Sequence, residues 1–133
     1  MADDVGSATP AAPVAADGAP DVLELVKVAA RAAAAKSGED TIVLEVGAVL
    51  SITGWFVITS GGNSRLVKTL AEEVEEQVAA AGGPKPLRVE GLDGLRWVLL
   101  DYGDFVVHVF LDEARDFYEL ERLWRDVPVV DWS

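Results

Sequence analysis

The stretch that decides the fold is Trp97-Val-Leu-Leu-Asp101-Tyr102-Gly103-Asp104-Phe-Val-Val-His108-Val-Phe. Two runs of Val, Leu and Phe, the residue types that favour strands, flank a short segment in which Asp and Gly surround one aromatic residue. Asp and Gly favour tight turns, because they tolerate turn backbone conformations and Asp bonds nearby backbone N–H groups. The stretch therefore predicts a β-hairpin.

The register of this hairpin decides which side chains share a face. A two-residue loop at Tyr102 and Gly103 predicts three cross-strand pairs: Asp101 with Asp104, Leu99 with Val106, and Trp97 with His108. Because side chains alternate between the two faces of a strand, one face carries these six residues. The other face is plainly apolar and is expected to be core; it carries Val98, Leu100, Phe105, Val107 and Val109.

The more polar face combines a large aromatic ring, two carboxylates and the only histidine of the chain. Two carboxylates opposite each other repel, so stability alone does not explain them. Either both aspartates cap the turn, or they belong to a binding surface. Trp97 and His108 on the same face favour the second interpretation, because Trp is enriched at interface hot spots. The candidate partner-binding residues are Trp97, Leu99, Asp101, Tyr102, Asp104 and His108.

Composition excludes several classes of function. The chain has 133 residues, enough for one domain with a real core, since half of them are hydrophobic. It has no cysteine and one histidine, which excludes disulfides, thiolate zinc sites and most catalytic triads. The net charge of −12 repels nucleic acid and anionic lipid and favours a basic protein as partner.

The two ends of the chain are predicted to be tails. Residues 1–20 are rich in Ala and Pro without periodicity, which predicts a disordered segment, and residues 129–133 are a short C-terminal tail. Asp3 and Asp4 stand where a signal peptide would carry basic residues, and no apolar run approaches the length of a membrane span. A cytoplasmic location is therefore expected.

Between the tails, the pattern predicts an α-β-β-α-β-β-β-α order. Helices are expected from Asp21 to Ser37-Gly38, from Asn63 or Ser64 to Gly82, and over residues 112–124. Strands are expected at residues 41–46, 55–59 and 87–90 and in the two arms of the hairpin. This order predicts an α/β (α+β) fold with a mixed five-stranded sheet flanked by helices.

One turn deserves a chemical interpretation. Ser60-Gly-Gly-Asn-Ser64 precedes a helix, where backbone N–H groups could cradle a phosphate, but the motif matches neither a Walker loop nor GxGxxG. Nucleotidyl transfer also needs carboxylates on one strand face to hold Mg²⁺, whereas Asp101 and Asp104 straddle a turn. An ordinary glycine turn is favoured, and no catalytic, metal-binding or cofactor-binding residue is predicted.

A second stretch, Glu113-Ala-Arg-Asp-Phe-Tyr-Glu-Leu-Glu-Arg-Leu-Trp124, follows the hairpin, and Phe56-Val-Ile-Thr-Ser-Gly61, Ser64-Arg65 and Val89-Glu-Gly91 precede it. Together with the hairpin, these motifs resemble the bacterial ribosomal silencing factor family, also called Iojap-like proteins, over residues 21–128.

The resemblance implies a nucleotidyltransferase-like fold without transferase activity. It implies binding to the large ribosomal subunit through ribosomal protein L-fourteen, which blocks docking of the small subunit and lowers translation when nutrients run short. It also implies a homodimer. The alternative hypothesis is a nucleotide-binding or nucleotidyltransferase-like enzyme that uses residues 60–64 and the hairpin acids.

Overall fold

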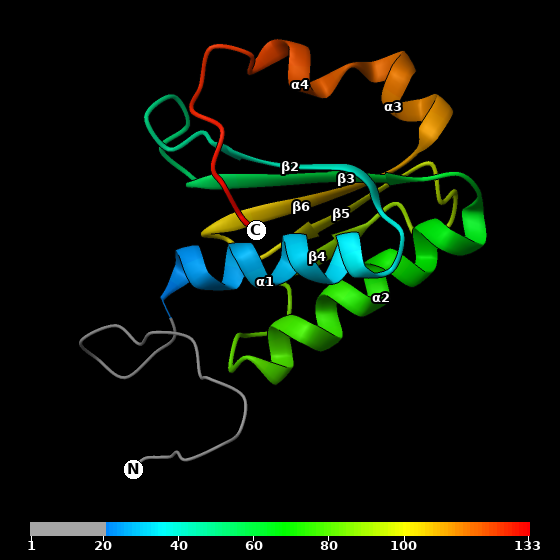
Figure 1. Ribbon diagram of the computed structural model, residues 1–133, viewed down its shortest axis with the longest axis horizontal. Helices are drawn as coiled ribbons and strands as arrows, with labels where there is room; N and C mark the ends of the chain where they lie inside the picture. Colours follow the sequence, from blue (N-terminus) through cyan, green and yellow to red (C-terminus); the bar gives the residue numbers. More distant parts are fainter. Residues whose placement is uncertain (1–20) are drawn as a thin grey trace.

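The structure is a computed structural model that describes residues 21–133; the tail predicted at residues 1–20 lies outside the described residues. One sheet is sandwiched between two helical layers, with α1 and α2 on one face and α3 and α4 on the other (Figure 1). The elements are α1 (Val22–Ala35), β2 (Glu39–Glu45), β3 (Trp55–Gly61), α2 (Ser64–Ala80), β4 (Arg88–Glu90), β5 (Trp97–Asp101), β6 (Phe105–Leu111), α3 (Asp112–Tyr118) and α4 (Leu120–Leu123). The predicted fold class is confirmed.

The sheet is mixed, with strand order β2-β3-β6-β5-β4. Only the central pair, β3 and β6, is parallel; the other neighbours are antiparallel. Six of the seven residues of β3 are buried, because helices cover this strand on both faces of the sheet. Such central strands are near-continuously apolar, as the sequence of β3 is.

The larger core lies between the sheet and the layer of α1 and α2. It contains all five residues of the predicted core face of the hairpin, each at most 2% exposed. The two helices begin where their caps predict. Asp21 Oδ1 accepts from the Leu23 N–H at 2.9 Å, and Asn63 Oδ1 accepts from the Leu66 N–H at 2.9 Å.

The hairpin register differs from the predicted one by two residues. Trp97 lies opposite Phe110, Leu99 opposite His108 and Asp101 opposite Val106, so the three predicted pairs are wrong. The reason is Gly103, whose φ of 85° suits the first position of a two-residue turn of type II′. The turn is therefore Gly103-Asp104, closed by the Tyr102 N–H donating to the Phe105 carbonyl at 2.9 Å. Because a two-residue shift preserves side-chain direction, the two faces remain as predicted.

The last helix is also different from the prediction. The expected helix over residues 112–124 is broken at Glu119, which has left-handed φ and ψ of 48° and 49°. The break turns the chain back over the sheet, so that Trp124 packs edge-on against Phe56 with 5.4 Å between ring centroids. Burial of Trp124 and Leu120 on the smaller core favours the break over a straight helix.

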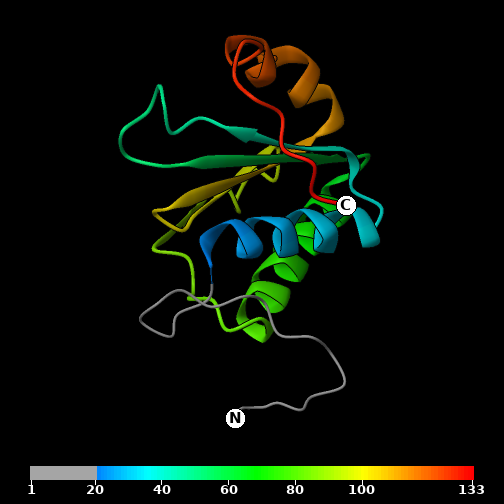
Figure 2. The same ribbon diagram turned by 60° about the vertical axis from the view of Figure 1, so that its left-hand side comes forward.

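The C-terminal segment packs on the edge of the sheet rather than forming a free tail (Figure 2). The Val130 N–H donates to the Val43 carbonyl, and the Glu45 N–H donates to the Pro128 carbonyl, both at 2.9 Å. Trp132 is half-buried, and its Nε1 donates to the Thr41 carbonyl at 3.1 Å. Trp132 is thus bound within the chain.

Candidate functional site

One face of the sheet, the upper one in Figure 1, is covered only in part by α3 and α4. This upper face carries most of the candidate binding residues. Trp97 is half-buried at the covered end, where its ring stacks on Phe110 and contacts Tyr118 of α3, with 4.8 and 5.0 Å between ring centroids. Leu99 and Asp101 follow it along β5 toward the uncovered end and are half-buried. Asp104 is exposed in the turn.

His108 is buried beside Trp97, at 4% exposure. The indole Nε1 of Trp97 donates to Nδ1 of His108 at 3.1 Å. Nδ1 is therefore an acceptor, and in the neutral ring the proton must lie on Nε2. Burial lowers the pKa of His108 to about 4, so the ring is neutral near pH 7.

Asp101 has a structural partner that sequence reasoning missed. Arg88, on the neighbouring strand β4, donates from Nη2 to Asp101 Oδ2 at 2.9 Å, and the Gly103 N–H donates to Oδ1 at 2.8 Å. The Arg88 hydrogen bond, and then the Gly103 N–H, hold the pKa of Asp101 below its usual range. Asp101 therefore caps the turn. It does not face Asp104, so the repulsion inferred from the sequence does not arise.

Tyr102 is not on the candidate face. Its ring is 5% exposed and stacks on Phe105, with 4.5 Å between centroids, in the larger core. Burial is the main cause that raises the pKa of its hydroxyl. The prediction that Tyr102 lies at an accessible loop is wrong because the turn begins one residue later.

A groove of about 570 Å³ lies at the uncovered end of the upper face. Its floor includes Leu99, Val106 and His108, and its walls include Ile52 from the loop between β2 and β3 and Leu87 from the segment before β4. Two polar atoms of its lining, Thr53 Oγ1 and His108 Nε2, are buried and have no hydrogen-bond partner within residues 21–133. Sequence reasoning found three of the lining residues, Leu99, Asp101 and His108, but not the loop that forms the wall.

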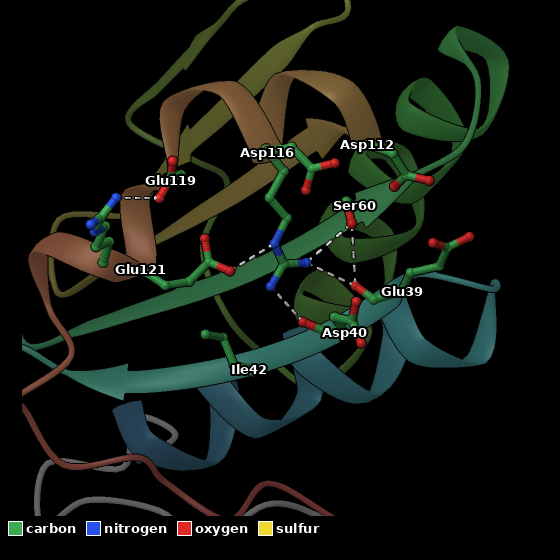
Figure 3. A pocket seen from close by; sticks show the side chains of 10 residues that line it. Glu39, Asp40, Ile42, Ser60, Asp112, Asp116, Glu119 and Glu121 are labelled. Carbon is green, nitrogen blue, oxygen red and sulfur yellow. Dashed lines mark hydrogen bonds and ion pairs between the residues drawn. The ribbon is translucent and has the colours of Figure 1, made fainter.

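A second pocket, of about 780 Å³, lies where the parallel strands β3 and β6 end. In Figure 3, dashed lines join one guanidinium, which the hydrogen bonds identify as that of Arg115, to Ser60, to Glu121 and to the backbone carbonyls of Glu39 and Asp40. Arg115 donates to the carbonyls of Glu39 and Asp40 at 3.0 and 2.7 Å, to Ser60 Oγ at 3.1 Å, and to Glu121 Oε2 at 3.0 Å. The guanidinium of Arg115 thus makes four hydrogen bonds within the chain, which use most of its N–H donors.

Acidic side chains surround this guanidinium. Asp112 lies at the start of α3, and its charge is the main cause that raises the pKa of Glu39. A Cβ at Gly62 would lie 3.7 Å from Asp112 Oδ2, so this carboxylate adjoins the glycine turn. Residues 21–133 contain no group of three or more side chains placed to hold a metal ion.

The residues of the alternative, enzymatic hypothesis do not meet in one site. The glycine turn follows the end of β3, whereas Asp104 lies beside its beginning, where its carbonyl accepts from the Gly54 N–H at 2.9 Å. The seven residues of β3 separate the two places by roughly 20 Å at the usual rise per residue. Residues 60–64 and the hairpin acids therefore cannot act on one substrate.

Comparison with known proteins agrees with this architecture. A crystal structure of a protein from Chromobacterium violaceum matches with a TM-score of 0.74 and 36% sequence identity, covering 78% of this chain and 86% of that one. The ribosomal silencing factor RsfS of Bacillus subtilis is 38% identical over 107 residues, which are 80% of this chain and 90% of that protein. The chloroplastic protein Iojap of Zea mays is 29% identical over 89% of this chain and 51% of its own length.

These similarities define a class of small α/β proteins that includes the ribosomal silencing factor of Bacillus subtilis and the Iojap protein of Zea mays. The family model described as "Ribosomal silencing factor during starvation" matches residues 19–133. The chain therefore belongs to the ribosomal silencing factor family, as its hairpin and final helices indicate. No helix within the described part of the chain is long and apolar enough to cross a membrane.

Proposed function

We propose that this protein represses translation by binding the large ribosomal subunit through ribosomal protein L-fourteen and blocking association with the small subunit. Family membership supports the proposal, because the family is described as a ribosomal silencing factor during starvation and the Bacillus subtilis relative is named a ribosomal silencing factor. The Bacillus subtilis relative is named as a silencing factor, not as an enzyme. The proposed action is steric, without cofactor or metal.

The observation that carries the proposal is the uncovered end of the upper sheet face. Leu99 lies there half-buried, although it is an apolar residue on the face opposite the main core. Apolar surface of this kind, rimmed by polar groups, is typical of protein-binding sites. The rim is acidic, with Asp101, Asp104 and Glu90 around the single base Arg88.

The sign of this charge fits the proposed partner. The whole chain carries a net charge of −12, and ribosomal proteins are mostly basic. Opposite charges across an interface raise the association rate and make binding sensitive to salt. The same negative charge opposes extensive contact with ribosomal RNA. The proposed surface comprises Leu99, Asp101 and Asp104, with His108 in the floor of the groove and Trp97 supporting it from beneath α3. The proposed site of action is the cytoplasm.

Sedimentation with separated ribosomal subunits tests this function directly. The protein is expected to sediment with the large subunit and not with the small one, and to reduce formation of whole ribosomes when both subunits are mixed. Purified L-fourteen should bind the protein without the rest of the subunit. Failure of the protein to sediment with the large subunit would contradict the proposal.

Two charge-reversal variants distinguish the effect of charge near the groove from the effect of the net charge of the chain. Asp104→Lys changes an exposed residue in the turn, and Glu72→Lys changes an exposed residue on α2, on the other side of the sheet. Both raise the net charge equally. Asp104→Lys is expected to slow association with the large subunit, while Glu72→Lys leaves it near the wild-type rate. Equal effects would mean that only the net charge matters. Sedimentation of the protein alone measures whether it forms the homodimer that the family resemblance implies.

A further inference from the structure

The groove at the uncovered end of the sheet is lined by buried polar groups that the described residues do not hydrogen-bond. His108 and Thr53 are both more than nine-tenths buried, and both are among the residues that line this groove. Within the described residues, His108 Nε2 and Thr53 Oγ1 have no hydrogen-bond partner. A buried polar group without a partner destabilises a fold, so such groups in a native structure need an explanation.

The hydrogen bond at Nδ1 of His108 decides whether Nε2 is a donor or an acceptor. Because Nδ1 of His108 accepts from Trp97 at 3.1 Å, Nε2 carries the proton and is a donor. The depressed pKa of the ring keeps it neutral, so Nε2–H suits an uncharged oxygen such as a carbonyl or hydroxyl. The Thr53 hydroxyl can donate or accept.

The remaining lining is mostly aliphatic. Leu50, Ile52, Leu87, Leu99 and Val106 contribute to it, beside the ring of Phe56. Ile52 and Leu87 are 82% and 72% exposed, which is unusual for residues of this size on the rim of a groove. A small molecule in the groove would leave the outer parts of these side chains in water, whereas a protein surface would cover them.

Charge selects among protein partners. Glu90 and Asp101 border the groove and share the single base Arg88, and Asp104 follows in the adjacent turn. A second copy of this chain, with its net charge of −12, would bring like charge to an acidic rim. A basic protein would bring opposite charge, which favours docking.

From these observations we infer that the groove receives an aliphatic side chain from a basic protein, whose adjacent carbonyl or hydroxyl oxygen accepts from His108 Nε2–H. This inference rests on the proposed function, in which L-fourteen is the basic partner, and it assigns the place and chemistry of the contact. The aliphatic chain lies over Leu99 and Val106, and Ile52 and Leu87 close over it. Basic residues flanking the inserted chain face Asp101 and Asp104.

Truncation of the groove walls tests the inference, with matched controls available in the chain. Ile52→Ala and Leu87→Ala shorten the two walls. Val49→Ala shortens a 65% exposed residue of the same loop, and Leu123→Ala a 78% exposed residue of α4; neither lines the groove. All four residues are largely exposed, so the melting temperatures should stay close to that of the wild type.

Affinity for the purified large subunit is the main measurement. The two groove variants are expected to bind roughly 5- to 30-fold more weakly than the wild type, and the two controls within about twofold of it. Thr53→Val keeps the shape of the side chain and removes the unpartnered hydroxyl. It should preserve or raise the melting temperature and weaken binding by roughly three- to tenfold.

The histidine donor has its own readout. In the ¹⁵N-labelled protein, NMR should show the Nε2–H tautomer of His108, and addition of purified L-fourteen should move the Nε2–H proton resonance downfield. An unchanged resonance in the saturated complex would contradict the hydrogen bond.

The possible failures are distinguishable. If the wild type does not bind the large subunit, the proposed function fails and this inference fails with it. If the wild type binds and Ile52→Ala and Leu87→Ala bind equally well, only the inference fails. If these variants dissociate a homodimer while their affinity for the subunit is unchanged, the groove holds a second copy of the chain, which also overturns the inference.

Discussion

Acidification should destabilise this protein through one residue, His108. The unfolded chain takes up a proton at the ordinary histidine pKa of 6.5, whereas the buried ring in the folded state does so only near pH 4. Between these values the unfolded state binds more protons than the folded state, so lowering the pH favours unfolding. The stability is complete above pH 6.5 and is lost progressively as the pH falls toward 4.

The size of the effect follows from the shift. The difference between 6.5 and about 4 corresponds to roughly 3 kcal/mol at full protonation, since one unit of pKa is about 1.4 kcal/mol. At pH 5 the unfolded chain is almost fully protonated and the folded chain hardly at all, which gives a loss of about 2 kcal/mol. Asp101, whose pKa is lowered, contributes its loss only at more acidic pH, below its ordinary value of 3.8.

Urea unfolding at a series of pH values between 8 and 5 measures this loss. His108→Gln is the matched variant, because its amide oxygen can accept from Trp97 and it does not titrate. Glu39 has a raised pKa and acts in the opposite direction, gaining stability as the pH falls, but it is present in both proteins. The difference between the two pH profiles therefore isolates His108. The wild type should lose about 2 kcal/mol more than the variant over this range.

Parallel pH profiles for the wild type and His108→Gln would refute the reasoning. An NMR titration of His108 in the folded wild-type protein gives an independent answer, which does not depend on how well the variant folds. Protonation of the ring with a midpoint above pH 6 would show that burial does not hold it neutral.

Three further predictions concern packing and the two edges of the fold. Arg115→Ala should destabilise the protein by about 3–5 kcal/mol, because it leaves Glu121 and two carbonyls without their donor. The control Arg122→Ala removes an exposed ion pair and should cost less than about 0.5 kcal/mol, and equal values for the two variants in urea unfolding would contradict this. Leu100→Ala should cost about 2–5 kcal/mol through a core cavity, and half-buried Leu99→Ala distinctly less; the reverse order in the same assay would mean that the faces are exchanged. Removal of residues 129–133 should lower stability by about 1–2 kcal/mol, because the docked Trp132 is lost; an unchanged melting temperature would show that this segment contributes nothing.

The sequence contains most of the information on the element order and on the main core. Asp21 and Asn63 mark the starts of two helices, because a side-chain oxygen at each position accepts from a nearby N–H. The core face of the hairpin follows from alternation alone, which is why an error of two residues in the register left Leu100 and Val107 correctly placed. The register itself depends on which residue takes positive φ, and Gly103 could occupy either turn position.

The upper layer was harder to predict because tertiary contacts override local preference there. Residues 112–124 have the charge order of one continuous helix, and no Gly or Pro marks Glu119 as the break. The break is favoured by distant contacts, namely those of Trp124 with Phe56 and of Arg115 with the first residues of β2. No periodicity within the helix indicates these contacts. The wall of the groove and the pairing of Asp101 with Arg88 likewise depend on contacts between segments that are distant in the sequence.

The position of α3 and α4 also explains why the polar groups at the two ends of the sheet differ in their hydrogen bonding. At the end where β3 and β6 finish, Arg115 of α3 donates to backbone carbonyls of β2 and to the hydroxyl of Ser60, so these polar groups are satisfied within the chain. At the opposite end Leu99 is only half-buried, and polar atoms of His108 and Thr53 have no hydrogen-bond partner within residues 21–133. The helical layer therefore satisfies polar groups at one end of the sheet and leaves polar groups without partners at the other, where a protein partner is proposed to bind. Loss of Arg115 should accordingly lower the stability of the fold, whereas truncation of Ile52 or Leu87 should lower binding and leave stability nearly unchanged.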